Sequence, residues 1–343
     1  MKKKFDFKDI TLVPETLSTI SSRSEINIFN EDGKLPLFVS PMDTVVDLTN
    51  YHKFVNEGFE VCLPRGINSY DDDIFVSVSL DDFEKMVNWS DWPVFKNEKI
   101  RLLVDIANGH MEKLYNLCKK FIKNRKSDNH KIMVGNIANP STYDKFAELG
   151  VDYIRVGIGG GSGCLTSANT GVHYPMASLI NECYRIKFSN DYTTKIVADG
   201  GFRNYDDIIK ALSLGADYVM LGGVLNKTLE SCSQNLLFKL IPLDEVKSKY
   251  VWDNYPKLRK YFYKQFRGMS TKEVQKKWGK EKLITSEGIV KLNKVESTLP
   301  SWTENFKDYL KSAMSYTNSK NLEEFKESEF IFITQNALDR YHK

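Results

Sequence analysis

The sequence has few cysteines, and nothing in their spacing suggests a cross-link or a metal site. Five occur in 343 residues, an odd number, and no two have the C-x-x-C spacing of zinc or redox motifs. We therefore expect no disulfide framework. The five are Cys62, Cys118, Cys164, Cys183 and Cys232. A structural thiol is the simplest interpretation of each, and only Cys164 lies in a loop where it would be reactive.

Long apolar runs and strong charge are also missing. No run is long enough to cross a bilayer, and the residues after Met1 do not form a secretory signal, so we expect a cytoplasmic protein. The net charge of +3 is too small to argue for nucleic acid or a membrane surface. The composition, 41% hydrophobic and 27% charged, is that of a globular protein with a large core. There is no repeat and no low-complexity tract.

One stretch is rich in glycine instead. Residues 157–163 contain five glycines and follow an apolar run, 153–156, that is typical of a buried strand. Such a loop can turn its backbone N–H groups inward around an anion. A thiol and a hydroxyl follow, Cys164 and Thr166, which suggests covalent chemistry on a phosphorylated small molecule. Because short glycine patterns are weak motifs, a flexible turn with a buried cysteine is an equal alternative at this point.

Eight short apolar segments predict parallel core strands, and most are followed by a segment with helical spacing. This alternation is typical of a parallel sheet covered on both faces, and eight units favour a closed (β/α)8 TIM barrel over an open sheet. The predicted strands are 37–40, 59–63, 75–79, 101–105, 131–135, 152–156, 195–199 and 217–221. The predicted helices include 111–122, 140–149 and 205–214. Residues 5–28 lack a helical period and are expected to lie as an arm against the barrel.

Polar residues and glycines collect where the predicted strands end, which is where such barrels place their functional groups. They are Ser40 to Met42, Asp105 with Asn108 and Gly109, Asn136, the cysteine loop, Asp199 to Gly201, and Gly222 with Gly223. A single aspartate at a strand end is more often a helix cap, but several on one rim indicate a site. The loops after strands seven and eight often bind phosphate.

The alternation stops after the eighth strand. Residues 226–300 are rich in Lys, Tyr and Trp, contain only short helical pieces, and are too long for a simple loop. We interpret them as the last barrel helix with an insertion that forms a lid or flap. Residues 302–322 predict a helix, a break and a second helix start, followed by a short apolar segment at 330–334. We expect residues 1–343 to form one barrel domain.

Several motifs, in this order along the chain, resemble the IMP dehydrogenase/GMP reductase family. They are residues 7–14 (FKDITLVP), 22–25 (SRSE), 40–45 (SPMDTV), 134–136 (VGN), 157–166 (GIGGGSGCLT), 198–201 (ADGG), 219–223 (VMLGG), 267–270 (RGMS) and 312–316 (SAMSY). The resemblance implies a (β/α)8 barrel, a purine nucleoside monophosphate as substrate, a nicotinamide cofactor and, usually, a homotetramer.

Three segments resemble the GMP reductase branch: residues 105–109 (DIANG), 170–175 (TGVHYP) and 286–288 (SEG). The span from Met269 to Glu287 is short and lacks the Arg-Tyr pair with which dehydrogenases of the family activate water. No regulatory (CBS) domain is inserted between strands two and four. The resemblance therefore implies reductive deamination of GMP to IMP.

In that reaction Cys164 attacks C2 of the purine, ammonia leaves, and the covalent thioimidate is reduced by NADPH, with NADH as the alternative cofactor. A thiol attacks only as the thiolate, which the N–H dipoles of the loop would stabilise. The resemblance implies Thr166 and Glu287 as the proton-transfer residues.

The resemblance also implies two sets of binding residues and a cation site. The nucleotide would be bound by Met42, Ser162, Asp199, Gly201, Gly222, Gly223, Gly268, Met269 and Ser270, with Ser162, Gly201 and Gly223 on the phosphate and Asp199 on the ribose. The cofactor would be bound by Asp105, Ala107, Asn108, Gly109 and Asn136. In some relatives a monovalent cation lies on carbonyls equivalent to those of Gly159, Gly161 and Cys164, which makes potassium a candidate here.

Some segments depart from the family pattern. Residues 64–67 (PRGI) replace a His-Lys-His-Tyr run, and residues 78–81 (VSLD) replace Ser-Ser-Gly-Thr. Arg65 keeps the positive charge of the lysine but does not replace it as a proton donor. Leu165 and Ser167 stand where a Thr and an Arg usually flank the catalytic Thr. These changes leave two alternatives open: a dehydrogenase-type enzyme or relative acting on another purine (deoxy)nucleotide, and an inactive nucleotide-binding barrel.

Overall fold

Eight parallel strands follow one another around a closed barrel, with the last hydrogen-bonded to the first. The computed structural model describes residues 3–67, 74–88, 99–125, 127–279, 285 and 288–341. The barrel strands are β2 (Leu37–Val39), β3 (Glu60–Leu63), β4 (Phe75–Val78), β5 (Ile100–Asp105), β6 (His130–Ile137), β7 (Tyr153–Val156), β8 (Lys195–Asp199) and β9 (Tyr218–Leu221). All eight predicted strands are thus confirmed, and so is the TIM-barrel class.

The strands are buried on both faces, as the continuous apolar runs predicted. Side chains that point into the barrel form their own cluster, with Phe38, Phe75, Tyr153 and Tyr218 in mutual ring contact. Three of these rings belong to the first residue of a strand, so the cluster fills the amino-terminal end of the barrel. The interior is a packed core, and a cavity can form only at the carboxyl ends.

Helices cover the outside of the barrel: α1 (Tyr51–Asn56), α2 (Leu80–Asn88), α3 (Glu112–Asn124), α4 (Pro140–Glu148), α6 (Met176–Ser189) and α7 (Tyr205–Ser213). Two short helices, α5 (Thr166–Thr170) and α8 (Gly223–Asn226), begin in the loops after β7 and β9 at the rim of the barrel. Local sequence explains where they begin. The Asn139 side chain accepts the Ser141 N–H and Pro140 takes the first helical position of α4, while Asn204 and Asp207 form a capping box on α7.

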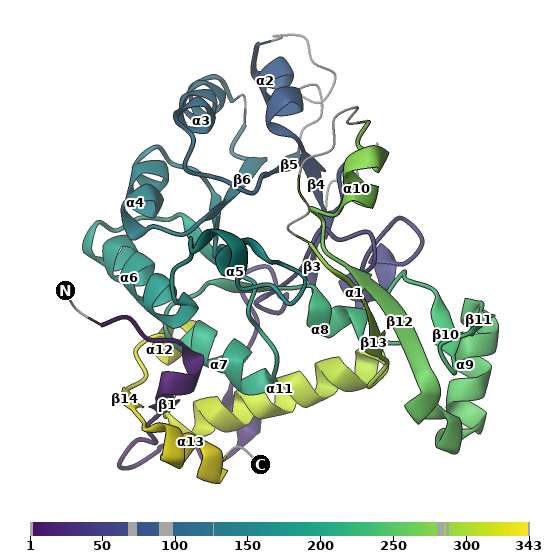
Figure 1. Ribbon diagram of the computed structural model, residues 1–343. Coiled ribbons are helices and arrows are strands. Elements are labelled where there is room, and N and C mark those ends of the chain that lie inside the picture. The colour runs from purple at the N-terminus through teal and green to yellow at the C-terminus, as the bar shows by residue number, and fades with distance from the viewer. Residues whose placement is uncertain are drawn as a thin grey trace.

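The insertion after β9 contains an antiparallel sheet that the sequence analysis missed. Its strands are β10 (Asn235–Leu237), β11 (Ile241–Leu243), β12 (Phe262–Arg267) and β13 (Val290–Lys294), in the order β11-β10-β12-β13. Between them lie α9 (Glu245–Asn254), the 3₁₀ helix η4 (Pro256–Tyr261) and α10 (Lys272–Lys277). In Figure 1 the sheet and α9 project to the right of the barrel, and α10 stands above the end of β12.

The period-two pattern of β12 is hidden because a charged residue faces inward. Phe262, Lys264 and Phe266 are all buried, and Lys264 has no exposed surface. Its ammonium group donates to the Leu229 carbonyl oxygen at 2.8 Å and to the Ser231 hydroxyl at 2.9 Å. These oxygens compensate for the burial of a polar group, which otherwise costs several kcal/mol. Because a lysine occupies one of the buried positions of β12, its sequence lacks the alternation of apolar and polar residues that predicts a strand.

The two ends of the chain lie together beneath the barrel. The arm contains η1 (Phe7–Asp9), β1 (Ile10–Leu12) and η2 (Arg23–Glu25), and β1 pairs antiparallel with β14 (Phe330–Phe332). The remaining carboxyl-terminal helices are α11 (Leu299–Tyr316), α12 (Leu322–Phe325) and α13 (Gln335–Tyr341). The structure thus confirms the predicted arm, and the apolar segment at 330–334 is the strand that holds it (Figure 1).

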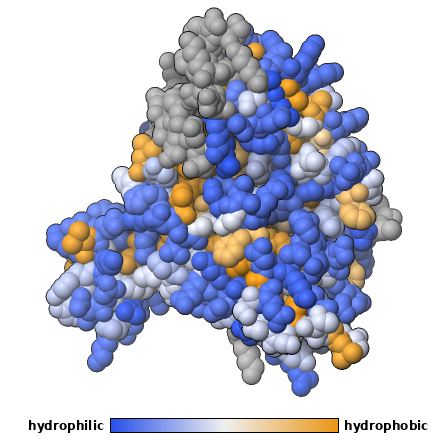
Figure 2. Space-filling view, turned by 180° about the vertical axis from the view of Figure 1, so that it is seen from behind, coloured by the Kyte–Doolittle hydropathy of each residue, from blue (hydrophilic) through white to orange (hydrophobic). Residues whose placement is uncertain are grey.

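The outer surface is mainly polar. On the face shown in Figure 2, hydrophilic side chains dominate and the apolar ones occur in small separate groups. Among the described residues, no helix combines the length and the apolar character needed to cross a membrane.

Candidate active site

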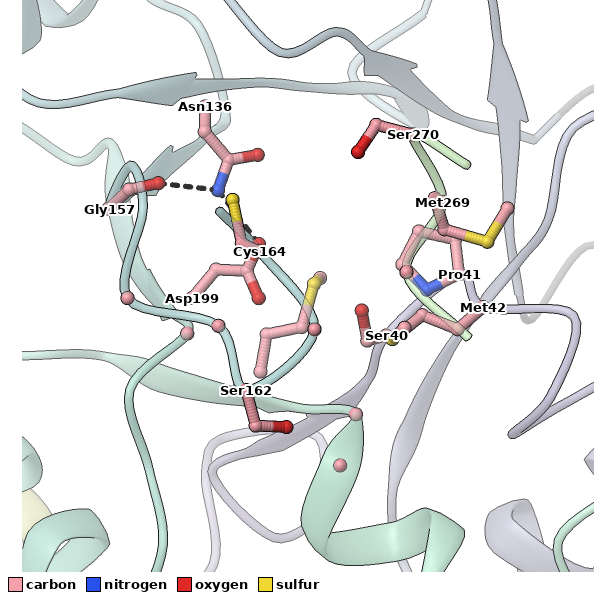
Figure 3. A pocket seen from close by; sticks show the side chains of 18 of the residues that line it. Ser40, Pro41, Met42, Asn136, Gly157, Ser162, Cys164, Asp199, Met269 and Ser270 are labelled. Atoms are coloured by element: carbon pink, nitrogen blue, oxygen red, sulfur yellow. Dashed lines mark hydrogen bonds between the residues drawn. The ribbon is translucent and has the colours of Figure 1, made fainter. Parts of the chain in front are cut away.

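A cavity of about 430 Å³ opens at the carboxyl ends of the barrel strands. This is within the usual size range of small-molecule sites, and it lies where TIM barrels place their chemistry. It is lined by the ends of seven barrel strands or their loops and by the segment from Phe266 to Trp278. Figure 3 shows the cysteine loop and Asp199 on one side of it, with Ser40 to Met42 and Met269 to Ser270 on the other. All nine residues predicted to bind the nucleotide line this cavity.

The glycine loops meet at one end of the cavity without space for side chains. A Cβ atom on Gly223 would lie 2.5 Å from the Ser162 hydroxyl oxygen, so these two loops require glycine there to approach each other. Gly201 has φ +91°, a conformation that other residues rarely adopt. The result is a polar concavity of backbone groups and one hydroxyl at the place where the sequence predicts a phosphate cradle.

Cys164 is half-buried and lines the same cavity. Its sulfur lies 3.2 Å from the hydroxyl oxygen of Thr166, the first residue of α5, and the thiol donates a hydrogen bond to that oxygen. The backbone of Cys164 is held by the Gly161 carbonyl at 2.9 Å and by an antiparallel bridge to Gly288. The third predicted catalytic residue, Glu287, lies outside the described residues, and its role stays a prediction.

A buried arginine connects two of the aspartates below the cavity. One Arg155 nitrogen lies 2.7 Å from Asp105 Oδ1 and the other 2.7 Å from Asp199 Oδ2, with 5% of the residue exposed. Burial lowers the pKa of Arg155, but the carboxylates of Asp199 and Asp105 outweigh that effect and raise it overall. The Asn136 amide also donates to Asp199 Oδ2, at 2.8 Å, so a single oxygen of Asp199 is held by two donors.

Sequence reasoning missed Arg155 although it left a signal. Arg155 is the only charged residue in the apolar run 153–156, and a charge in a buried strand requires a partner. The partners come from β5 and β8, the strands on either side of β6 and β7, and the alternation along β7 turns Arg155 to the inside of the barrel.

A second arginine and a tryptophan form another wall. Arg65, which follows β3, approaches Asp105 Oδ2 to 3.3 Å through its Nε and also donates to the Asp105 carbonyl. Its guanidinium carbon lies 4.4 Å from the centre of the Trp278 ring, a cation–π stack, and both residues line the cavity. Trp278 ends α10, so this contact joins the insertion to the barrel.

With this geometry in place, a comparison with protein families assigns the chain. The model described as the IMP dehydrogenase / GMP reductase domain matches residues 94–343, well over half of the sequence. The chain belongs to this family. It is similar to GMP reductase of Ascaris suum (27% identity, covering 98% of this chain and 95% of the relative) and to GMP reductase 2 of Mus musculus (28%, 97% and 95%). GMP reductase of Lactobacillus acidophilus is 27% identical over 98% of this chain.

The cofactor residues expected for an IMP dehydrogenase/GMP reductase family member are only partly brought together. Asp105, Ala107 and Asn136 line the cavity, whereas Asn108 and Gly109 do not. The Asn108 side chain is exposed and accepts the His110 N–H. A Cβ on Gly109 would lie 2.7 Å from the Ile137 side chain, so this glycine is required for packing between loops. Of the five predicted cofactor residues, Asp105, Ala107 and Asn136 thus share the cavity wall with Arg65 and Trp278.

The potassium site implied by the family finds weaker support. The Gly159 carbonyl accepts the Ser167 hydroxyl at 3.0 Å, and the Gly161 carbonyl accepts the Cys164 N–H. Two of the three expected ligands are therefore already engaged, and no group of three or more metal-ligating side chains occurs among the described residues. The loop in this conformation does not fit a closed cation cage.

Proposed function

We propose that the protein is a GMP reductase-type oxidoreductase that converts GMP to IMP and ammonia with a nicotinamide cofactor, NADPH in the first instance. One observation carries the proposal: the Cys164 thiol, with Thr166 beside it, lines the same cavity as the cradle of Ser162, Gly201 and Gly223. The length of a purine nucleotide would place the base at the thiol when the phosphate lies in the cradle. The full-length similarity to GMP reductases supports this choice of substrate.

The residues of the chain would act as follows. The Cys164 sulfur forms a bond to C2 of the purine. The 2-amino group takes up a proton and leaves as ammonia. The family resemblance implies that Thr166 and Glu287 relay this proton. NADPH, when bound, supplies the hydride that C2 needs. The C–S bond then breaks, its electrons return to sulfur, and IMP leaves.

Asp199 would orient the ribose. Its Oδ2 is fixed by Arg155 and Asn136, so the other carboxylate oxygen is directed to the nucleotide hydroxyls as acceptor. Met42 would pack on the base and the backbone of Gly268 to Ser270 would read its edge. Gly222, beside Met42 and Ser40, closes the remaining wall. Water must be kept from the covalent intermediate, which it would otherwise convert to XMP, and the bound nucleotide and cofactor would fill the space that water could enter.

The proposal has further parts that rest on family resemblance. They are NADPH in preference to NADH, a homotetramer, a cytoplasmic location, and one barrel domain over residues 1–343.

The test is an absorbance assay of the purified protein with GMP plus NADPH, beside IMP plus NAD⁺ and 2′-deoxy-GMP plus NADPH. Loss of NADPH with GMP alone is expected. If only IMP plus NAD⁺ reacts and NADH forms, the protein is a dehydrogenase. If only 2′-deoxy-GMP is turned over, its substrate is a deoxynucleotide. Nucleotide binding without turnover in any arm would favour the inactive barrel.

A further inference from the structure

Helix α10 is attached to the barrel rim at both of its ends by an arginine. Near its start, Arg267 binds Glu273 of α10 and Asp43 of the loop after β2, each at 2.6 Å. At its end, Trp278 stacks on Arg65 of the loop after β3. The helix therefore lies across the carboxyl end of the barrel, fixed at two points to two neighbouring barrel loops.

The two attachments differ in exposure and therefore in strength. Glu273 is 62% exposed, so its ion pair with Arg267 is screened by solvent and contributes little. The Arg65 side chain is 20% exposed and makes three contacts, with the ring of Trp278, the Asp105 carboxylate and the Asp105 carbonyl. A planar guanidinium can stack and donate at once, which a lysine ammonium cannot do. The Arg65–Trp278 contact is thus the firmer of the two.

This contact also determines the shape of the cavity next to the proposed cofactor residues. Asp105 is held between Arg65 on Oδ2 and Arg155 on Oδ1, so both of its oxygens are fixed. Arg65 and Trp278 line the cavity together with Asp105 and Ala107. A planar ring entering here meets a wall whose position depends on the stack.

We propose that Arg65 and Trp278 are positioning residues for the nicotinamide cofactor. The inference rests on the proposed function and adds two residues to it. Through the stack, Trp278 holds α10 over the cavity and Arg65 holds Asp105, and together they fix the width of the gap that the nicotinamide ring enters. Neither residue belongs to the nucleotide cradle, so their loss should weaken cofactor binding and leave nucleotide binding unchanged.

The experiment compares four variants with a matched control. Arg65→Met and Trp278→Leu remove the stack, whereas Arg65→Lys and Trp278→Phe keep a cation or a ring. The control is Arg259→Met, which breaks a similar contact on the projecting insertion, where Arg259 lies 5.4 Å from the ring centre of Trp252 and donates to its carbonyl. Arg259 does not line the cavity.

We expect the KM for NADPH to rise about tenfold in Arg65→Met and Trp278→Leu, which is what the loss of one partly buried cation–π contact implies. Trp278→Phe should recover most of the affinity, and the KM for GMP should stay within twofold in every variant. Amide hydrogen exchange of residues 272–278 should be faster in Arg65→Met than in the parent or in Arg259→Met. This second readout does not depend on activity.

Two results would overturn the inference: an unchanged KM for NADPH with unchanged exchange in α10, or an equal rise in both KM values, which would indicate a general structural defect. Thermal melting identifies a variant that fails to fold. If Arg65→Met or Trp278→Leu does not fold, the conservative variants Arg65→Lys and Trp278→Phe provide the test of the inference. If the parent does not turn over GMP with NADPH, the proposed function fails. If it does, and the variants behave like Arg259→Met, only this inference fails.

Discussion

Cys164 and Thr166 lie two residues apart and share a hydrogen bond of 3.2 Å between sulfur and hydroxyl oxygen. The bond spans the point where the glycine loop ends and α5 begins, so the two functional groups are placed by local backbone geometry. In this state the thiol donates the hydrogen bond and the hydroxyl oxygen accepts it. The two groups that the proposed mechanism needs are thus in contact in the absence of substrate.

Replacing Cys164 with Ala should abolish turnover and leave GMP affinity within a few-fold of the parent, because the cradle uses other residues. Isothermal calorimetry with GMP, together with the NADPH assay, measures both quantities. A parallel loss of binding and turnover would show that the cysteine is structural.

The approach of Gly223 to Ser162 gives a second prediction. A methyl group on Gly223 would meet the Ser162 hydroxyl at 2.5 Å, so Gly223→Ala should weaken GMP binding about tenfold or more by spreading the cradle. The double variant Gly223→Ala/Ser162→Ala removes the atom that clashes. Its affinity should return to that of Ser162→Ala alone, which lacks one proposed phosphate donor. An equal loss from Gly223→Ala with and without the Ser162 hydroxyl would show that the clash is not the cause.

Arg155 should be essential for stability as well as for the site. Arg155→Met would leave Asp199 without its cation and Asp105 with Arg65 alone, and breaking a buried ion pair by removing one partner typically costs about 3–5 kcal/mol. Arg155→Lys keeps the charge but cannot reach both carboxylates with separate nitrogens, so its cost should be smaller. Urea unfolding should give the highest free energy of unfolding for the parent, a lower one for Arg155→Lys and the lowest for Arg155→Met. Equal free energies of unfolding would contradict this prediction.

Lys264 predicts a pH dependence of stability. Burial lowers its pKa to about 7, although oxygen acceptors surround the ammonium group. Between pH 7 and the usual lysine pKa the unfolded chain binds more protons than the folded protein, so stability from this residue rises with pH, by at most about 1.4 kcal/mol per unit. Below pH 7 both states are protonated and the contribution is constant.

The measurement is urea unfolding at pH 7, 8 and 9 of the parent and of Lys264→Met. The difference between them should shift in favour of the parent as the pH rises. Lys249→Met on α9, where the lysine is exposed, serves as the control and should show no such trend. A constant difference for Lys264→Met would show that its ammonium stays charged throughout.

The barrel and the cysteine loop at its rim were predictable because their signals are local, and the family motifs supplied the other residues predicted to line the cavity. Each strand is a short apolar run, and the run 157–166 carries its glycines, thiol and hydroxyl in adjacent positions. Asn108 and Gly109 show the limit of motif matching. They belong to the same short motif as Asp105, but a motif does not reveal which side chains face the cavity.

The remaining parts depend on contacts between distant segments. Arg65 and Trp278 are more than 200 positions apart in the sequence, and they come into contact only because α10 lies over the barrel. The sheet containing β12 was missed because Lys264 interrupts the apolar alternation, and its oxygen partners come from another loop. Such compensation of a buried charge cannot be read from one segment alone.

The ring cluster of Phe38, Phe75, Tyr153 and Tyr218 has a kinetic consequence. It plugs the barrel at the amino-terminal end, so reactants and products share a single mouth at the other. Two bulky molecules that share one opening must bind and dissociate in sequence, and the one bound nearer the opening dissociates first. We therefore expect the product-inhibition pattern of an ordered mechanism, in which the product bound next to α10 is released first.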